Sequence, residues 1–174
     1  MSELLTSEAC ALLALDLSHT HIDGWELVQA IRANRSLTSL DVRGVPRIAD
    51  LYETLGNVLA QPGYPCRIGF LRCDAFELLE TATTLDLSER RVEPGAAKLL
   101  AGLLKHNRTL QHLDLTATCL EQQGLAALAA ALELNASLLT LKAAHNPGLD
   151  EAAKATLRAA AERRSPPLAV ELSE

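Results

Sequence analysis

The chain has 174 residues, of which 48% are apolar and only 3% aromatic, and its formal net charge at pH 7 is -6. A chain of this length and composition can bury the core of one domain, so we expect a single domain spanning residues 1–174. The acidic balance disfavours binding to phosphate backbones, and few aromatic side chains are available to stack on bases, so nucleic acid is not an expected partner.

The N-terminal segment, residues 1–11, predicts a short helical cap that begins at Ser2 or Ser7. It has no basic stretch, and the apolar run that follows is short, which argues against a signal peptide and against a membrane span. We therefore expect an intracellular, cytoplasmic protein with no membrane partner. The four cysteines show no CxxC spacing, so they are expected to be reduced and to pack as small apolar side chains.

Residues 12–149 contain a repeated pattern in which apolar residues alternate over a short segment, as Leu15 and Leu17 do. This alternation predicts a half-buried strand in each segment. The anchor residues of the six segments are Leu15, Leu40, Leu71, Leu85, Leu113 and Leu141. Neighbouring anchors are 25, 31, 14, 28 and 28 residues apart, and the first two spacings together equal twice 28. Insertion and deletion have therefore disturbed a common period.

Between most of the strands, apolar residues follow helical spacing, as they do between Leu99 and Leu104. Helix start signals agree with this pattern. Asp23 and Glu26 can form a capping box, and Pro94 stands where the first residue of a helix would be. Each full unit therefore predicts a strand followed by a helix. The strands must then be parallel, with every connecting helix on the same side of the sheet.

This pattern resembles the leucine-rich repeat family, and its period resembles the ribonuclease-inhibitor-like type within that family. The resemblance implies an α/β leucine-rich repeat solenoid of about six repeats, with a curved parallel sheet on the concave side and helices on the convex side. The family places Asn at the turn after each strand. Asn146 matches that position, and Thr20 and Thr118 can substitute for it. In the family, the side chain of this Asn bonds neighbouring backbone. The residues at this position that cannot form the same bonds are Val45, Phe76 and Arg90.

The spacing of 14 between Leu71 and Leu85 is too short for a strand, a turn and a helix of three turns. The third repeat is therefore predicted to have lost its helix. The segment 61–66, with two prolines and a glycine, is expected to form a loop that ends the preceding helix. The loss should leave a gap on the convex side that is either covered by Tyr64, Phe76, Leu78 and Leu79 or left exposed. We expect Phe76 and Leu78 to pack into the core rather than to bind a partner.

Three segments satisfy the N-x-[ST] glycosylation pattern, at Asn34, Asn107 and Asn135. Each Asn falls 19 or 22 residues after its anchor leucine, which places it at the end of a helix. Asn tolerates the left-handed conformation that many helix ends adopt. Because no signal peptide precedes them, a structural cap is favoured over glycosylation.

Metal and catalytic sites are not expected. His19 and His145 fall in the same column of the first and last strands, and His19 with His21 supplies two ligands without a third. Cys73 takes the inward strand position that leucine holds in other repeats, so burial rather than nucleophilic chemistry is its expected role. The sequence predicts no enzyme, no metal and no cofactor.

The residue between the two inward leucines of each strand should point to the concave face. This column reads Asp16, Asp41, Arg72, Asp86, Asp114 and Lys142. Two pairs of carboxylates, Asp16 with Asp41 and Asp86 with Asp114, should stand about 5 Å apart on adjacent strands. Arg72 is expected to lie between the two pairs.

The flanking columns place Phe70 and His112 beside this row, among mostly small residues. Two interpretations remain open. The row is either a self-compensating ladder, in which Arg72 and Lys142 offset the carboxylates, or an acidic strip that receives Lys or Arg side chains of a partner. Aromatic and arginine side chains concentrate interface energy, so this face is the predicted partner-binding site.

Residues 150–174 predict a last helix, followed by a strand over "PPLAVEL" that seals the array. Both ends are therefore expected to be capping units, although the first and last units can equally join further repeats of a longer protein. The main functional hypothesis is a non-enzymatic module, monomeric alone, that binds another protein with a basic surface through the concave strand face.

The resemblance implies the same function, because ribonuclease inhibitor, NOD-like receptors and tropomodulin bind proteins through such arrays. Two alternatives come from other functional classes. One is a GTPase-activating protein of the Ran-activator type, which shares this type of repeat. The other is a structural subunit of a large assembly, whose surface serves packing.

Overall fold

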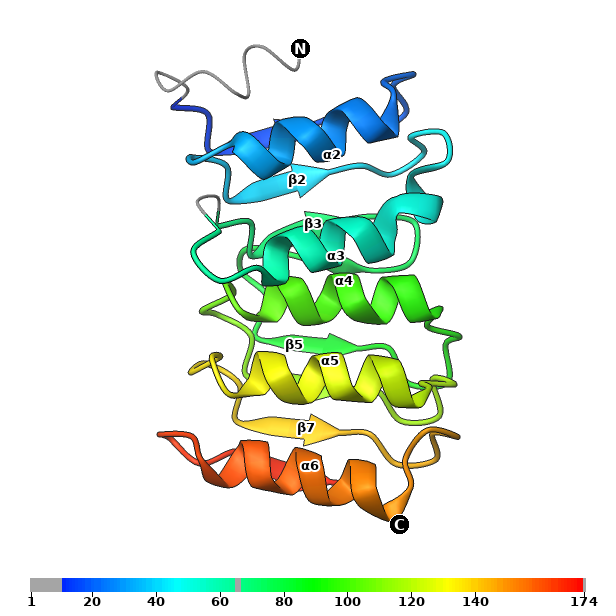
Figure 1. The fold of residues 1–174 in the computed structure, drawn as a ribbon, viewed down its shortest axis with the longest axis vertical. Helices are drawn as coiled ribbons and strands as arrows, with labels where there is room; N and C mark the ends of the chain where they lie inside the picture. The colour runs from blue at the N-terminus through cyan, green and yellow to red at the C-terminus, as the bar shows by residue number, and fades with distance from the viewer. Residues whose placement is uncertain (1–10, 65–66, 174) are drawn as a thin grey trace.

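The computed structural model describes residues 11–64 and 67–173. Its elements form two layers, strands on one side and helices on the other, stacked along the long axis of the molecule (Figure 1). The predicted N-terminal cap falls almost wholly outside the described residues. The elements are, in chain order, β1 (Ala14–Asp16), α2 (Gly24–Ala33), β2 (Ser39–Asp41), the 3-10 helix η1 (Ile48–Leu51), α3 (Tyr52–Ala60), β3 (Phe70–Arg72), β4 (Glu77–Leu78), β5 (Thr84–Asp86), α4 (Pro94–Leu104), β6 (His112–Asp114), α5 (Gln122–Leu132), β7 (Thr140–Lys142), α6 (Glu151–Glu162) and β8 (Ala169–Glu171).

The strands form two four-stranded sheets, in the orders β1-β2-β3-β4 and β5-β6-β7-β8. All pairs are parallel except β3 with β4, which is antiparallel. The registers align the anchor leucines, for instance Leu40 with Leu71 and Leu85 with Leu113, so the alternation identified these strands correctly. The expectation of one continuous parallel sheet is wrong, because no pairing among the described residues joins β3 or β4 to β5.

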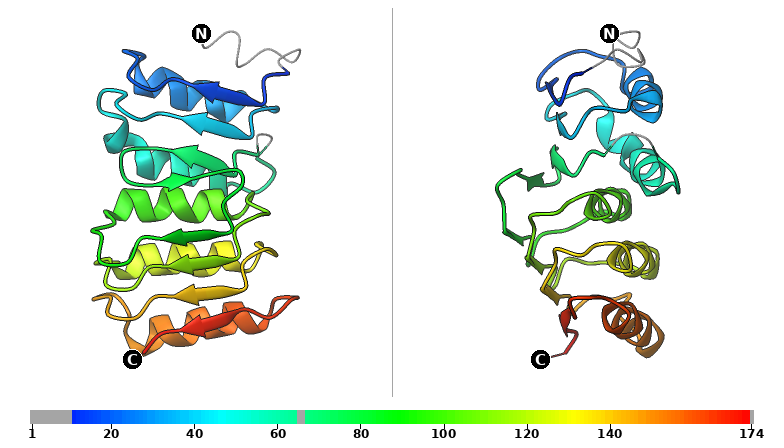
Figure 2. Two further views of the ribbon diagram at one scale, coloured as in Figure 1. Left: turned by 180° about the vertical axis from the view of Figure 1, so that it is seen from behind. Right: turned by 90° about the vertical axis from the view of Figure 1, so that its left-hand side faces the viewer.

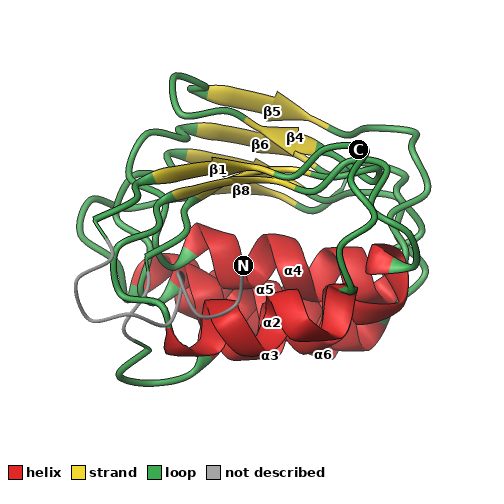
Figure 3. Ribbon diagram, turned by 90° about the horizontal axis from the view of Figure 1, so that it is seen from above, coloured by secondary structure: helices red, strands yellow, loops and turns green. Residues whose placement is uncertain are grey.

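The break in the strand layer comes from a hairpin in the short repeat. No helix forms between β3 and β5, as predicted, but the Cys73 N–H donates to the Phe76 carbonyl at 3.0 Å and the chain returns as β4. The strand layer projects outward at β4 and β5 (Figure 2), and β5 lies far from the helices (Figure 3). The expected even concave curve is therefore interrupted. We call the side of the strand layer that faces away from the helices the strand face.

The helix layer has no gap where one was expected. Helix α3 packs directly against α4 (Figure 2). Two glycines permit this close approach. A Cβ at Gly56 would lie 2.5 Å from the backbone carbonyl of Lys98, and a Cβ at Gly102 would lie 2.7 Å from the carbonyl oxygen of Gly56. The predicted gap on the convex side is wrong, because the two helices close over the missing one.

Three of the four residues expected to cover that gap pack in or against the core. Phe76 and Leu78 are buried as predicted, with 3% and 1% of their surfaces exposed. Tyr64 contacts the core, and its hydroxyl donates to the Ile31 carbonyl at 2.8 Å. Leu79 remains exposed. The hairpin therefore fills the core from the strand side.

The helices begin at the predicted signals. Asp23 caps α2, because its Oδ1 accepts the Glu26 N–H at 3.0 Å, and α4 begins at Pro94. The predicted last helix and strand are α6 and β8, and β8 pairs with β7 in parallel. Among the residues that the structure describes, no helix has both the length and the apolar character needed to cross a membrane.

A turn in the left-handed conformation follows each regular strand, four residues after its anchor leucine. The residues with positive φ at this position are His19, Gly44, Glu89, Ala117 and His145. At the position after the left-handed residue, a polar side chain forms hydrogen bonds that hold the turn, as predicted for Thr118 and Asn146. The Thr118 N–H and hydroxyl donate to Asn146 Oδ1 at 3.1 and 3.2 Å, and Asn146 Nδ2 donates to the Leu115 carbonyl at 2.7 Å.

The three asparagines of the glycosylation pattern follow helices as predicted, and each is at most 2% exposed. The expected left-handed cap is wrong, since Asn34 has φ -69 and the other two are not among the positive-φ residues. Their side chains bond the loop instead. Asn107 Oδ1 accepts the N–H groups of Thr109 and Leu110 at 3.1 and 2.8 Å. In Asn107 and Asn135 the Nδ2 atoms donate to buried carbonyls, which leaves no room for a glycan.

Candidate protein-binding face

The predicted column of charged residues lies on the strands at the expected positions. Pairing places Asp16 opposite Asp41 and Asp86 opposite Asp114, so both predicted carboxylate pairs are cross-strand neighbours. Arg72 lies opposite Asp41. It does not bridge to Asp86 as expected, because β3 and β5 belong to different sheets. The column is therefore divided into two groups.

Asp16 and Asp86 are exposed and make the same local contact. Asp16 Oδ1 accepts the Ser18 N–H at 2.8 Å, and Asp86 Oδ1 accepts the Ser88 hydroxyl and N–H at 2.7 and 2.9 Å. Hydrogen bonds from the Ser18 side chain and backbone lower the pKa of Asp16, and those from Ser88 lower the pKa of Asp86. Both carboxylates therefore stay ionised at the surface, where they can receive a cation.

Asp41 differs from them because it is buried, with 5% of its surface exposed, and is held by arginine. Arg43 Nη2 lies 2.6 Å from Asp41 Oδ2, and Arg43 Nη1 lies 3.0 Å from Glu77 Oε1. Arg72 Nη1 approaches Asp41 at 3.9 Å. Burial alone would raise the pKa of Asp41, but the hydrogen bonds from Arg43 outweigh it and lower the pKa. This group is the self-compensating part of the row.

The second sheet carries the remaining candidate residues. Asp114 is half-buried, and its Oδ1 accepts the N–H two residues further on at 2.9 Å. Lys142 Nζ lies 3.4 Å from Oε2 of Glu171 on β8, a neighbour that the sequence analysis did not include. The exposed His112 ring places Nδ1 2.7 Å from Thr140 Oγ1. Cations and anions alternate along this part of the face.

A groove of about 460 Å³ runs along the first sheet. Asp16, Asp41, Phe70 and Arg72 line it, so the structure brings four of the predicted residues together. Its far wall is the segment from Leu79 to Thr81, which follows β4 and was not predicted to take part. This wall exists because the hairpin projects outward. The only sequence signal for it was the 14-residue spacing itself.

A second aromatic surface, at the start of α2, was missed by the sequence analysis. Trp25 is 53% exposed. It lines a groove of about 510 Å³ together with His21, Pro46, Arg47 and Asp50. Arg47 Nε lies 3.0 Å from Asp50 Oδ2, so the charges in this groove are paired. The single Trp of the chain was the signal that could have found it.

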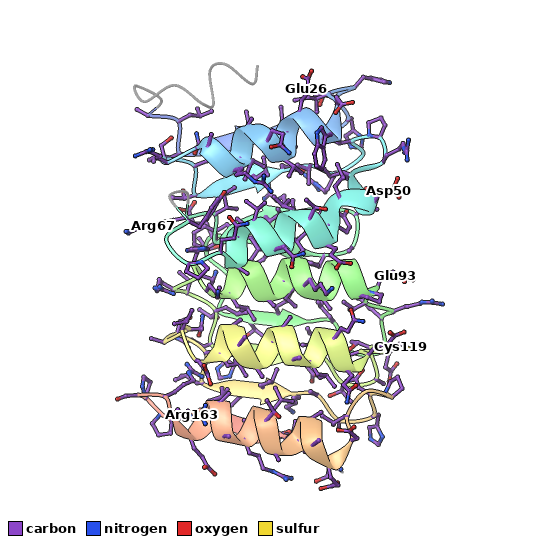
Figure 4. All side chains as sticks on the ribbon, in the orientation of Figure 1. Glu26, Asp50, Arg67, Glu93, Cys119 and Arg163 are labelled. Carbon is purple, nitrogen blue, oxygen red and sulfur yellow. The ribbon has the colours of Figure 1, made fainter. Side chains whose placement is uncertain are left out.

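The cysteines and histidines form no chemical site among the described residues. Cys73 is buried as predicted, and burial raises the pKa of its thiol. Cys119 is exposed on the edge of the molecule that also carries Asp50 and Glu93 (Figure 4), and neither cysteine forms a disulfide. Across residues 11–64 and 67–173, no three side chains of His, Cys, Asp or Glu gather to hold a metal ion.

Comparisons with known proteins give one family match. A family model described as Leucine Rich repeat matches residues 106–129, which contain β6 and most of α5. Together with the parallel strands and the single layer of helices, this match fits a leucine-rich repeat fold. No curated protein matches the sequence.

Two solved structures are similar to the chain. One is actin-binding site 2 of leiomodin-1, at 14% identity over 92% of this chain and 87% of that chain, with a TM-score of 0.42. The other is the tropomodulin C-terminal domain of Caenorhabditis elegans, at 14% identity over 93% of this chain and 89% of that chain, with a TM-score of 0.42.

Proposed function

We propose that this chain is a leucine-rich repeat solenoid of the ribonuclease-inhibitor-like type, with about six repeats, and that it is a non-enzymatic module that binds another protein through the strand face. The observation that carries the proposal is the groove beside β1 to β3. It combines a half-buried aromatic ring at Phe70, a guanidinium at Arg72 and an exposed carboxylate at Asp16. Aromatic and arginine side chains are the residues that anchor protein interfaces.

The charge of the face favours a partner with a basic surface. Asp16 and Asp86 are exposed, and no ion pair within the described residues holds either carboxylate. Such charges speed encounter and select complementary partners more than they add affinity. Asp41 is excluded from this role by its burial and its bonds to Arg43. The acidic part of the site is therefore smaller than the full column.

The test is quantitative affinity capture from native lysate with matched variants. The strand-face variant carries Asp16→Asn, Asp86→Asn and Asp114→Asn, which preserve the Oδ1 acceptors of the local turns. The control carries Glu26→Gln, Glu121→Gln and Glu162→Gln, an equal change of charge on exposed residues away from the strand face. We expect a partner that the wild type and the control hold and the strand-face variant loses.

Equal capture by all three proteins would overturn the choice of the strand face. No specific capture, together with sedimentation of the chain in a large particle, would instead favour a structural subunit. The GTPase-activator alternative has no observation on the described surface in its favour.

A further inference from the structure

The break between the two sheets leaves β5 with an open edge inside the strand layer. One edge of β5 pairs with β6, and no strand within residues 11–64 and 67–173 pairs with the other. Its neighbour on that side is β4, which pairs only with β3 (Figure 2). An open strand edge is a template for pairing with another chain.

The backbone groups at this edge can be assigned from the bonds on the opposite one. The Thr83 carbonyl accepts from the N–H of His112, and the Leu87 N–H donates to the carbonyl of Asp114. Alternate residues of a strand direct their N–H and C=O groups to opposite edges. Thr84 and Asp86 therefore direct theirs away from β6, toward the open side. Both residues are exposed.

A groove of about 550 Å³ lies beside this edge. Leu85, Asp86, Leu87 and Arg90 line one side, and the turn of the hairpin from Cys73 to Glu77 lines the other together with Arg43. Leu85 is 8% exposed, whereas the equivalent Leu113 and Leu141 are 1% and 0% exposed. The inner side of the groove therefore offers apolar contact that the regular strands do not offer.

Charges of both signs line the outer side of the groove, since Arg43 and Arg90 lie there with Asp74, Glu77 and Asp86. The Asp86 carboxylate accepts hydrogen bonds from Ser88, and no basic side chain in the described part of the chain lies within ion-pair distance of it. Across the groove, Glu77 is already held by Arg43 at 3.0 Å. Oppositely charged residues on adjacent strands stabilise their pairing. A strand beside β5 would therefore be favoured by a basic residue opposite Asp86.

We propose that the open edge of β5 accepts an extended segment of a partner protein as an added β-strand, with apolar residues facing Leu85 and a Lys or Arg facing Asp86. Main-chain bonds to Thr84 and Asp86 give this segment its affinity, and the alternating side chains give its specificity. The inference rests on the proposed function, since it names the way in which the protein partner binds.

The experiment selects peptides from a phage-displayed library of random twelve-residue sequences on the full chain. We expect the selected peptides to alternate β-branched or aromatic residues with polar ones and to carry Lys or Arg. A synthetic copy is then titrated against the wild type, Thr84→Pro, Thr84→Val and Asp86→Asn. Proline at position 84 removes the outward N–H and leaves the bonds of β5 to β6 in place, whereas valine keeps that N–H.

Thr84→Pro should weaken binding at least tenfold, Asp86→Asn severalfold and Thr84→Val less than twofold. Hydrogen exchange gives a direct readout, because the peptide should protect the amides of Thr84 and Asp86, which have no backbone partner in the part of the chain that the structure describes. A peptide N-methylated at alternate residues should lose affinity for the wild type, which keeps the test informative even where Thr84→Pro does not fold.

The proposal is overturned if the library yields no binding peptide, or if Thr84→Pro binds as well as the wild type with no protection at positions 84 and 86. A dimer of this chain that Thr84→Pro abolishes, seen by light scattering, would overturn the choice of a foreign partner. Lysate capture that the strand-face variant loses and Thr84→Pro keeps would leave the proposed function standing and remove this mode of binding.

Discussion

The segment from β5 to β8 and the segment from β2 to β5 use the same repeat differently. In the first, the anchor leucines are 28 residues apart and each strand leads to a helix and then to the next parallel strand. In the second, the anchors are 31 and then 14 residues apart, and the chain forms a hairpin between two strands of the template. The hairpin adds a strand without adding a helix.

This difference shows that the helix layer and the strand layer need not contain the same number of elements. The glycines at positions 56 and 102 allow α3 and α4 to pack side by side. The strand layer must then fit β3, β4 and β5 against these two helices. Strand β4 pairs antiparallel with β3 and with no other strand among the described residues, so the first sheet ends at the hairpin. The layer opens at this point, which creates both the wall of the groove and the free edge of β5.

One template position shows the contrast most clearly, five residues after the anchor leucine. In the regular segment it holds Asn146, whose side chain bonds the turn of the preceding unit. In the hairpin it holds Phe76, which is 3% exposed. The same position therefore supplies hydrogen bonds in one region and apolar packing in the other. Substitutions at these positions separate the two.

Phe76→Ala should have the largest effect on stability. Removing a fully buried aromatic ring costs about 3–5 kcal/mol, from lost transfer free energy and the cavity left behind. Arg90→Ala is the matched control, because Arg90 holds the same template position in the next unit and is exposed. It should change the free energy of unfolding by less than about 0.5 kcal/mol. Urea unfolding measures both. Equal effects would show that the hairpin is not packed on the core.

Asn146→Ala should cost about 3 kcal/mol. The substitution leaves the N–H groups of Thr118 and Leu120 and the carbonyl of Leu115 without their buried partner. Each unsatisfied group costs about 1–3 kcal/mol, and water that enters the site can form some of the lost hydrogen bonds and so offset part of the total. Asn57→Ala, on the exposed side of α3, provides the control and should be nearly neutral. A loss below about 1 kcal/mol in urea unfolding would mean that the turns do not depend on this side chain.

Gly56→Ala tests the close approach of α3 and α4. Alanine favours a helix over glycine by about 1 kcal/mol, but its Cβ would lie 2.5 Å from the backbone of Lys98. Overpacking costs about 1–3 kcal/mol, and a contact this close to backbone falls at the upper end of that range, so the net loss after the helix gain should be about 2 kcal/mol.

The control for this glycine is Gly124→Ala in the regular segment. Its Cβ would meet only side chains, Ala97 at 3.0 Å and Leu120 at 3.4 Å, so the gain in helix propensity should nearly balance these contacts. Thermal unfolding of the two variants side by side gives the comparison. A stabilised Gly56→Ala protein would show that the helices can separate freely.

The sequence predicted the parts of this molecule that follow a period. Alternating leucines identified the strands and their pairing, and Asp23 and Pro94 marked helix starts. The hairpin was not predicted, since β4 is only two residues long, too short to show a period, and its pairing depends on a turn between Cys73 and Phe76. The helix gap was wrongly predicted because the contact of Gly56 with α4 lies between segments far apart in the chain.

For the candidate site, too, the sequence predicted the regular features and missed the irregular ones. The column of aspartates was correctly placed on adjacent strands, because register follows from the leucines. The burial of Asp41 could not be predicted, since the Arg43 side chain that turns back onto it also bonds Glu77 in the unpredicted β4. The irregular region therefore determines that Asp41 is buried while Asp16 and Asp86 stay exposed on the strand face.

Asp41→Asn should give the smallest effect, about 1 kcal/mol near neutral pH, and its pH dependence tests the buried ion network. In the folded protein the bonds from Arg43 hold the pKa of Asp41 below its usual value of 3.8. A carboxyl group with a lowered pKa contributes stability that is present above its unfolded pKa and is lost as the pH falls through the folded one. The difference in unfolding free energy between the wild type and Asp41→Asn should therefore be constant above about pH 5 and shrink below about pH 4. Urea unfolding from pH 7 to pH 2.5 measures it. Parallel curves for the wild type and Asp41→Asn over this range would mean that Arg43 does not hold the carboxylate, and the self-compensating group would then join the acidic surface open to a partner.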